Sequence, residues 1–257
     1  MAAATRRRFA LIAVALALVA ALIWLAVDPS RRESAPLFRH GALRIGVDAS
    51  YPPFAFLADD QLHGLDVDLG RALADELDIP AQFVLLGFDG LYDGLQTDQV
   101  DVLISALRID PGRQVHYSLP YFDAGLALVS AAGRDFTTMA ALSGHALAFE
   151  FGSEAHSEAN RWLRRIQPFE TRPYELPAYA LDAVRLGHAD AALVDAVSAR
   201  LYLRDQPDWG AQMSVVRPVP LAIATRIDRL DRALAVNEAL AALIEDGTVA
   251  ALIDRWL

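Results

Sequence analysis

The chain contains no cysteine and no lysine, and all 23 of its basic residues are arginines. The missing cysteine excludes a disulfide framework, a thiol nucleophile, a thiolate metal site and a lipid-modified cysteine near the N-terminus. The six histidines are scattered without the spacing of metal ligands, so we expect no metal and no cofactor. The 33 acidic residues give a net charge of −10, which argues against a nucleic-acid partner because phosphates bind cationic surfaces.

The 257 residues are 54% apolar, a fraction too high for low-complexity disorder, and their number suits one large domain or two small ones. The charge is distributed unevenly along the chain. Residues 1–40 hold six arginines and two acids, a charge of +4. The other 217 residues hold 17 arginines and 31 acids, a charge of −14. A basic N-terminal segment therefore precedes an acidic domain.

Residues 9–27 within the basic segment form an unbroken run of 19 apolar residues. A helix that spans a bilayer needs about 20 such residues, whereas the apolar part of a cleavable signal has about 7–15. We therefore predict a signal-anchor and linker over 1–40, with 9–27 as a transmembrane tether; a cleaved signal peptide is the alternative. The arginines before the run resemble a twin-arginine signal, which leaves the export route open.

Short apolar runs alternate with segments of helical periodicity over the rest of the chain, which indicates the α/β class with a mostly parallel sheet. The predicted strands are 43–47, 81–86, 100–104, 146–149, 191–194 and 221–224. The predicted helices are 66–77, 90–97, 153–166, 178–186, 196–203, 230–245 and 249–256. Asp66 is placed to cap the first of these helices.

Four motifs occur in a characteristic order: YPPF at 51–54, GLDVDL at 64–69, FDGL at 88–91 and VDVLIS at 100–105. With them, the chain resembles the family 3 solute-binding proteins, the periplasmic receptors of polar amino-acid ABC importers. The resemblance continues through later motifs and covers residues 42–257. It implies a periplasmic, monomeric receptor that delivers its ligand to an ABC transporter permease.

The resemblance also implies a two-lobed clamshell of the type II periplasmic-binding-protein fold. Lobe one would comprise 42–130 plus 222–257, and lobe two would comprise 131–218. The two crossings between the lobes would form a hinge near 129–130 and 219–220. A ligand would bind in the cleft at the carboxyl ends of the strands, and closure around it would signal occupancy.

A zwitterionic amino acid needs a cation for its carboxylate and an anion for its ammonium group. Arg113 stands where the family has its carboxylate-binding arginine, and a guanidinium offers a planar fork that matches a carboxylate. Asp110 and Pro111 before it resemble a helix N-cap with proline at the first helical position. Asp195 follows an apolar strand and is the candidate for the ammonium, although an aspartate there also suits the cap of helix 196–203.

Other candidate ligand-binding residues follow from the same resemblance. Tyr51 and Phe88 match the aromatic pair that encloses the ligand side chain, with ordinary core packing as the alternative for Phe88. Asp48 matches a polar ligand contact, although a turn aspartate would bond to its own backbone. Ser153 precedes a helix whose first N–H groups would bind a carboxylate. Ser105 and Ala106 complete this set of candidates.

Two positions depart from the family pattern. Arg108 stands where relatives have a small hydroxyl residue, and Glu154 stands where they have threonine or serine. A second arginine would favour a doubly anionic ligand, whereas a glutamate would oppose an anion at that helix start. We expect Arg108 and Glu154 either to restrict the ligand or to pair across the cleft.

Three functions remain open at this point. The first is a non-catalytic binding protein for a polar amino acid or a similar zwitterion. The second is an enzyme similar to cyclohexadienyl dehydratase; such relatives carry a glutamate where this chain has Ser198, although Glu154 could serve as an alternative acid. The third is a membrane-tethered sensory or accessory binding domain.

Overall fold

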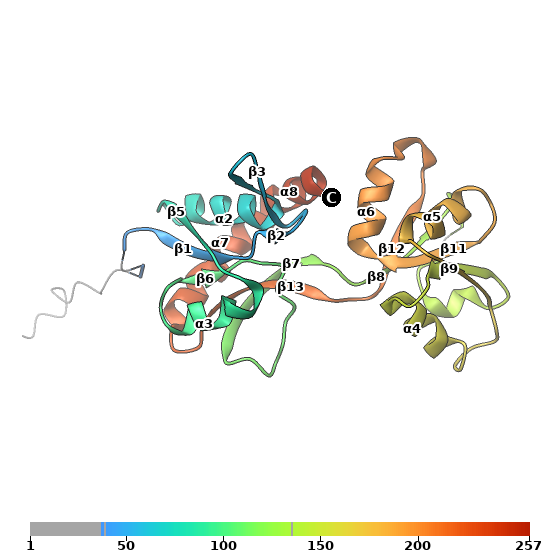
Figure 1. The fold of residues 1–257 in the computed structure, drawn as a ribbon, viewed down its shortest axis with the longest axis horizontal. Helices are drawn as coiled ribbons and strands as arrows, with labels where there is room; N and C mark the ends of the chain where they lie inside the picture. Colours follow the sequence, from blue (N-terminus) through green and yellow to red (C-terminus); the bar gives the residue numbers. More distant parts are fainter. Residues whose placement is uncertain (1–36, 39, 135) are drawn as a thin grey trace, which may run out of the picture. The chain divides into compact units, whose positions relative to one another are not determined.

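A computed structural model describes residues 37–38, 40–134 and 136–257. The chain separates into two units, 1–39 and 40–257, and the fold described below is that of the second (Figure 1). The predicted transmembrane tether at 9–27 lies outside the described residues. Within the described ranges, no helix combines the length and the apolar character needed to cross a membrane.

The first five-stranded sheet has the strand order β5, β1, β6, β13, β7. Its strands are β5 (Ala81–Leu85), β1 (Leu43–Val47), β6 (Val102–Leu103), β13 (Pro220–Arg226) and β7 (Val115–Asp123). β5, β1 and β6 run parallel, whereas β13 is antiparallel to both of its neighbours. All five residues of β1 are buried, as expected for a central strand covered on both faces.

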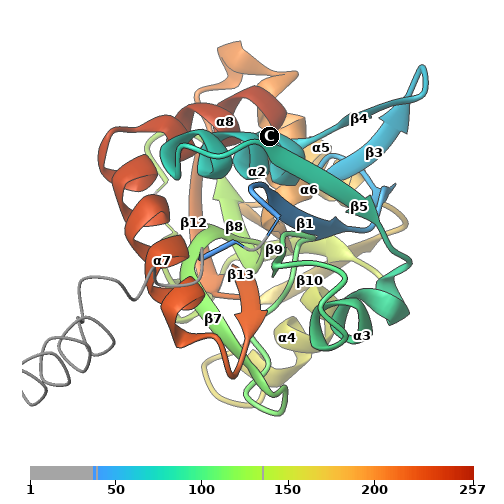
Figure 2. The same ribbon diagram turned by 90° about the vertical axis from the view of Figure 1, so that its left-hand side faces the viewer.

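Helices cover both faces of the first sheet. Figure 2 shows α2 (Leu65–Glu76) and α7 (Leu230–Glu245) on one side and α3 (Leu91–Gln96) on the other. The short helix η2 (Phe88–Gly90) leads into α3, and α8 (Thr248–Trp256) packs against α2 and α7.

The start of α2 depends on glycine rather than on the predicted aspartate cap. Gly64 is the N-cap residue, with φ of 129°. A Cβ there would lie 2.1 Å from the backbone oxygen of Phe54, so no other residue fits without movement. Asp66 is the second residue of the helix and is fully buried. The prediction that it caps its own helix is therefore wrong, because its carboxylate bonds to other segments.

A buried ionic cluster lies at the start of β6. Asp101 accepts hydrogen bonds from Nε and Nη2 of Arg44, each at 2.9 Å, and pairs with Nη1 of Arg232 at 2.5 Å. Asp101 is fully buried and Arg232 is 1% exposed. Burial alone would raise the pKa of the Asp101 carboxyl, but the hydrogen bonds from Arg44 and the charges of Arg232 and Arg44 together hold that pKa below its usual value.

The second five-stranded sheet has the order β10, β9, β11, β8, β12. Its strands are β10 (Glu170–Tyr174), β9 (Ala146–Glu150), β11 (Ala191–Asp195), β8 (Leu126–Ser130) and β12 (Gln212–Arg217). β10, β9 and β11 are parallel, and β8 is antiparallel to β11 and β12.

Alternating side chains of the second sheet fill two apolar clusters. Leu147 and Phe149 belong to one cluster with the inner face of α4 (Glu154–Trp162). Ala148 belongs to the other, with α5 (Pro177–Arg185) and part of α6 (Ala196–Arg204). The two-residue period of a strand therefore places α4 and α5 on opposite faces.

A small third sheet, β2 (Ser50–Tyr51), β3 (Ala55–Ala58) and β4 (Gln61–His63), projects from the first. Asp59 and Asp60 form the two-residue turn between β3 and β4, and both adopt positive φ, as a tight hairpin requires. The short helices η3 (Met139–Leu142) and η4 (Pro207–Trp209) complete the elements.

The chain crosses between the two large sheets after β7 and again after β12. Ala124 N–H donates to the Val219 carbonyl at 3.0 Å, which ties the two crossings together. Gly125 lies so close to the second crossing that a Cβ would meet the Arg217 carbonyl at 2.0 Å. The sequence prediction placed 126–130 in lobe one, but this segment is β8 and pairs within the second sheet. The boundary was placed late because apolar β8 carries no turn residue that separates it from β7.

Candidate functional site

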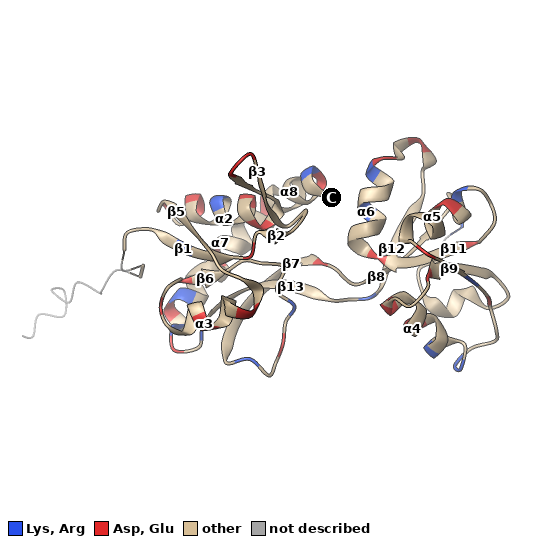
Figure 3. Cartoon of the chain, viewed as in Figure 1, with Lys and Arg blue, Asp and Glu red and all other residues tan. Residues whose placement is uncertain are grey.

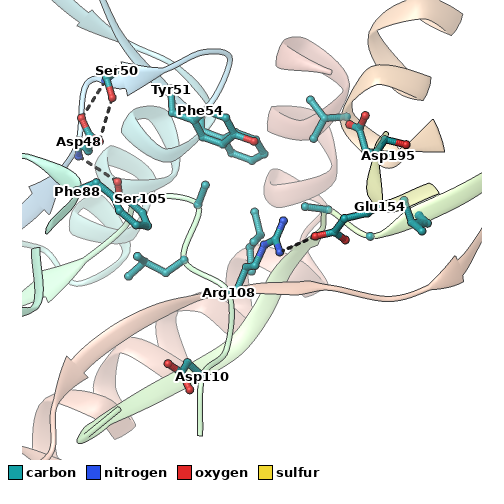
Figure 4. Close-up of a pocket in the computed structure, with 18 of the residues that line it drawn as sticks. Asp48, Ser50, Tyr51, Phe54, Phe88, Ser105, Arg108, Asp110, Glu154 and Asp195 are labelled. Atoms are coloured by element: carbon teal, nitrogen blue, oxygen red, sulfur yellow. Dashed lines mark hydrogen bonds and ion pairs between the residues drawn. The ribbon is translucent and has the colours of Figure 1, made fainter. Parts of the chain in front are cut away.

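One cavity of about 840 Å³ is lined by residues of both lobes. All ten residues that the sequence analysis selected line it: Asp48, Tyr51, Phe88, Ser105, Ala106, Arg108, Arg113, Ser153, Glu154 and Asp195. Figure 4 shows Asp48 and Tyr51 facing Glu154 and Asp195 across the cavity. The volume falls in the range of small-molecule sites, which is about 300–1,000 Å³.

Strand ends position these residues. Asp48 directly follows β1, Ser105 is the second residue after β6, and Asp195 is the last residue of β11. Because parallel strands end at the same edge of a sheet, side chains distant in sequence converge on the cavity.

The Asp48 carboxylate lies in a local hydrogen-bond network. Its oxygens accept from the backbone N–H of Ser50 at 3.1 Å and from the Ser50 hydroxyl at 3.0 Å. Its own N–H donates to the Ser105 hydroxyl at 3.0 Å. Asp48 is thus a turn aspartate, the alternative considered from the sequence, and it also lines the cavity.

The aromatic residues of the first lobe present open faces. Tyr51 stacks on Phe54 with ring centroids 5.4 Å apart and planes 10° from parallel. Phe54 is buried, whereas Tyr51 is 54% exposed and Phe88 is 61% exposed. Core packing for Phe88, the alternative left open by the sequence, is therefore excluded. Exposed aromatic rings at a cavity mark a surface that a ligand would cover.

Arg113 lies in a turn rather than at the predicted helix start. Asp110 Oδ1 accepts from the Gly112 N–H at 2.9 Å, and the Arg113 N–H donates to the Asp110 carbonyl at 3.1 Å. The N-cap prediction for Asp110 and Pro111 is wrong because the chain continues directly into β7, which pairs with β13.

The Arg113 guanidinium stacks on Tyr92, 4.4 Å from the ring centroid. Stacking uses the face of the guanidinium and leaves its edge suited to a carboxylate. Tyr92 lies on α3, four residues after Phe88, and also lines the cavity. The sequence analysis missed it, although its helical spacing from Phe88 was a usable signal.

Asp195 caps α6, with Oδ1 accepting from the Ser198 N–H at 2.8 Å. A carboxylate has a second oxygen for a further donor, so this cap is compatible with ammonium binding. Ser153 caps α4 in the same way, accepting from the His156 N–H at 3.3 Å. Both caps hold their helix starts at the cavity wall.

Glu154 joins the two sides of the cavity. Its Oε1 lies 3.5 Å from Nη1 of Arg108 (Figure 4). Its Oε2 lies 3.3 Å from Nη1 of Arg217. The expected pairing of Arg108 with Glu154 is therefore present, and Arg217, at the end of β12, was missed. These side chains are 37–63% exposed, so each pair contributes little, about 0–1 kcal/mol.

Acidic residues dominate the charged lining of the cavity. Figure 3 shows that acidic residues are present on both lobes. The acids are Asp48, Asp89, Asp110, Glu150, Glu154 and Asp195, against Arg108 and Arg113. This surplus creates a negative potential that favours a ligand carrying positive charge. Among residues 37–38, 40–134 and 136–257, no three His, Cys, Asp or Glu side chains gather into a possible metal site.

The chain resembles known proteins over almost all of its described length. Residues 43–257 match the model of the bacterial extracellular solute-binding proteins, family 3. The L-cystine-binding protein TcyJ of Escherichia coli K12 is 30% identical over 223 residues, which cover 84% of this chain and 82% of that protein.

Two further proteins show similarity. The ABC transporter arginine-binding protein 1 of Escherichia coli K12 is 30% identical over 223 residues, 83% of this chain and 90% of that one. The crystal structure of an ancestral cyclohexadienyl dehydratase has a TM-score of 0.72 at 23% identity, covering 86% of this chain and 94% of that one. The last similarity concerns the fold alone.

Proposed function

Since the chain belongs to the bacterial extracellular solute-binding proteins of family 3, we propose that its cavity binds a polar amino acid for delivery to an ABC importer. The observation that carries this proposal is the arrangement of one cavity with Arg113 in lobe one and Asp195 in lobe two. The guanidinium would hold the ligand carboxylate, and the aspartate would hold its ammonium group.

The lining supports an amino acid with a cationic side chain. Tyr51 and Phe88 offer flat faces that would enclose a planar or aliphatic group and attract a cation. The surplus of carboxylates in the lining favours the same charge. One relative is named as an arginine-binding protein. Arginine combines a planar cationic group with an aliphatic stem. Closure of the lobes would bury both aromatic rings.

The extracytoplasmic setting is part of the proposal. Residues 9–27 would tether the protein to the inner membrane, or would be removed after export, and the receptor would act as a monomer beside its permease. Membranes are separated from soluble protein, and the full chain is located by immunoblot beside a variant lacking 1–40. A tethered chain would be found with the membranes, whereas a cleaved chain would be found in the soluble fraction, as the variant would.

A thermal-shift screen of amino acids tests the proposed ligand. A ligand present at 100 times its Kd stabilises the folded state by about 2.7 kcal/mol. For a domain of this size, that corresponds to a rise in Tm of about 5–10 °C. We expect L-arginine to give such a rise and agmatine, which lacks the carboxylate, to give almost none.

Incubating the same protein with prephenate or arogenate and assaying for product distinguishes a binding protein from an enzyme. We expect no product from prephenate or arogenate, because position 198, three residues after Asp195, is a serine without an acidic group. Product formation would favour the dehydratase alternative, and the absence of any shift across the amino acids would contradict the proposed function.

Variants of the cross-cavity ion pair test whether Arg108 and Glu154 restrict the ligand. We expect the Arg108→Ser, Glu154→Thr double variant to bind a wider range of amino acids. Its affinity for the amino acid that the parent binds should change by up to about fivefold, because exposed ion pairs contribute at most about 1 kcal/mol. Isothermal titration calorimetry measures both. Arg185→Ser is the matched control, because it breaks an exposed ion pair with Asp182 outside the cavity. Unchanged range and affinity would contradict the idea.

A further inference from the structure

The buried carboxylate of Asp66 lies directly behind the cavity wall. Asp66 is fully buried in the first turn of α2. Its Oδ2 accepts a hydrogen bond from the backbone N–H of Ala106 at 2.6 Å. Its Oδ1 accepts from the Tyr121 hydroxyl at 2.7 Å. The short distance to the Ala106 amide is typical of a charge-assisted hydrogen bond.

Ala106 needs such support because its backbone is strained. It is an alanine with φ of 46°, in the left-handed region that side chains with a Cβ avoid. Ala106 lines the cavity between Ser105 and Arg108, which line it as well. Beyond it, the Leu107 carbonyl accepts from the Ala222 N–H at 2.9 Å, so β13 holds the far side of the segment. Asp66 holds the segment at the strained residue itself.

The carboxyl group of Asp66 is costly to ionise in its buried position. Burial raises the pKa of its carboxyl to about 6, although the hydrogen bonds from Tyr121 and Ala106 act to lower it. A raised pKa means that the folded chain binds this proton more tightly than the unfolded chain does. Stability from this group is therefore present at acid pH and is lost as the pH rises through 6. A buried carboxylate that bonds to a strained cavity residue points to a role in the site.

Tyr121, the second hydrogen-bond partner of Asp66, connects the cavity segment to the crossing between the lobes. Tyr121 lies on β7, which ends at Asp123, and the first crossing follows at Ala124. Asp66 thus bonds at once to the cavity segment and to the strand that leads into lobe two. Its position allows it to keep these two parts of lobe one in register.

We propose that Asp66 is a positioning residue for ligand binding, which holds the backbone of residues 105–108 in its binding conformation and ties this segment to β7. This inference rests on the proposed function, because the segment matters only if the cavity binds a ligand. Asp66 itself is absent from the cavity lining and acts through Ala106.

Two substitutions separate positioning from a purely structural role. Asp66→Ala removes the acceptor and should weaken binding of L-arginine at least tenfold by calorimetry. Asp66→Asn keeps an oxygen for the Ala106 amide and an NH₂ group for the Tyr121 oxygen. We expect it to retain affinity within about threefold, with a Tm equal to or above that of the parent at pH 7.5. Parent-like affinity of Asp66→Ala would overturn the proposal.

A second variant keeps the test decisive if Asp66→Ala does not fold, and a third serves as a control. If Asp66→Ala does not fold, Tyr121→Phe removes only the hydroxyl and should weaken binding at least threefold; unchanged affinity would overturn the proposal. Asp101→Asn is the control, since it alters the buried ionic cluster of the same lobe and should lower Tm without changing affinity.

Hydrogen exchange of the ligand-free protein distinguishes this inference from the proposed function. Amides of residues 105–108 should exchange at least tenfold faster in Asp66→Ala than in Asp66→Asn. If the parent binds no amino acid, the proposed function fails, while this comparison still tests the positioning. Equal exchange in the two variants would overturn it.

Discussion

Replacing Arg113 with methionine is expected to weaken amino-acid binding by about 30-fold to several thousand-fold. Removing one partner of a desolvated, hydrogen-bonded charge pair costs about 2–5 kcal/mol, and each 1.4 kcal/mol is a factor of ten in Kd. Methionine keeps an unbranched apolar stem and removes the charge and the planar fork. Calorimetric titration with the amino acid that gives the largest thermal shift measures the effect.

Two further variants make this result specific to the fork. Arg113→Lys keeps the charge but offers no bidentate donor pair, so its loss of affinity should be smaller than that of Arg113→Met. Arg71→Met removes another half-exposed arginine of lobe one, which pairs with Asp68 on α2 away from the cavity, and should leave Kd unchanged. Parent-like binding by Arg113→Met would show that the ligand carboxylate binds elsewhere.

Replacing Asp101 with alanine is expected to lower the free energy of unfolding by about 3–5 kcal/mol. Breaking a buried ion pair removes the main counter-charge of its buried partners. Here the partners are Arg44 and Arg232, the latter with a side chain only 1% exposed. The resulting like charges at the start of β6 would also repel each other. Urea unfolding followed by circular dichroism measures the change.

Asp228→Ala is the matched control for this variant. Asp228 pairs with Arg226 at 2.5 Å, but its side chain is 56% exposed, so its removal should lower the free energy of unfolding far less than removal of Asp101. Equal losses in the two variants would contradict a special contribution from the buried cluster. Because a salt bridge in the interior is screened little, added salt should not rescue Asp101→Ala.

The sequence predicted the buried parallel strands well and several antiparallel strands poorly. β1, β9 and β11 are short, largely buried apolar runs, and their predicted bounds differ from the observed ones by at most one residue. β7 and β12 were not predicted, because each mixes polar and apolar residues at the edge of its sheet. Their pairing depends on contacts with β13 and β8 that no local pattern records.

Cavity residues could be predicted from the sequence where a recognisable motif lies at the end of a predicted strand. Asp48 and Asp195 follow apolar strands, and the carboxyl ends of parallel strands converge at one edge. Arg217 and Tyr92 were missed, since their roles come from side chains of Glu154 and Arg113 that approach from elsewhere in the chain. That Arg113, Arg108 and Glu154 act on the ligand is the prediction that the variants above test.

The sequence by itself determined the α/β class, the separation of a basic N-terminal segment from an acidic domain, and ten of the residues that line the cavity. The class and the charge division follow from hydrophobic periodicity and composition, and the ten residues follow from short motifs that resemble a known family. Only the tertiary structure decided that Asp66 supports Ala106 instead of capping α2, and that Arg113 stacks on Tyr92. Burial and hydrogen bonding depend on which distant segments meet, so the same aspartate is a surface cap in one context and a buried support in another.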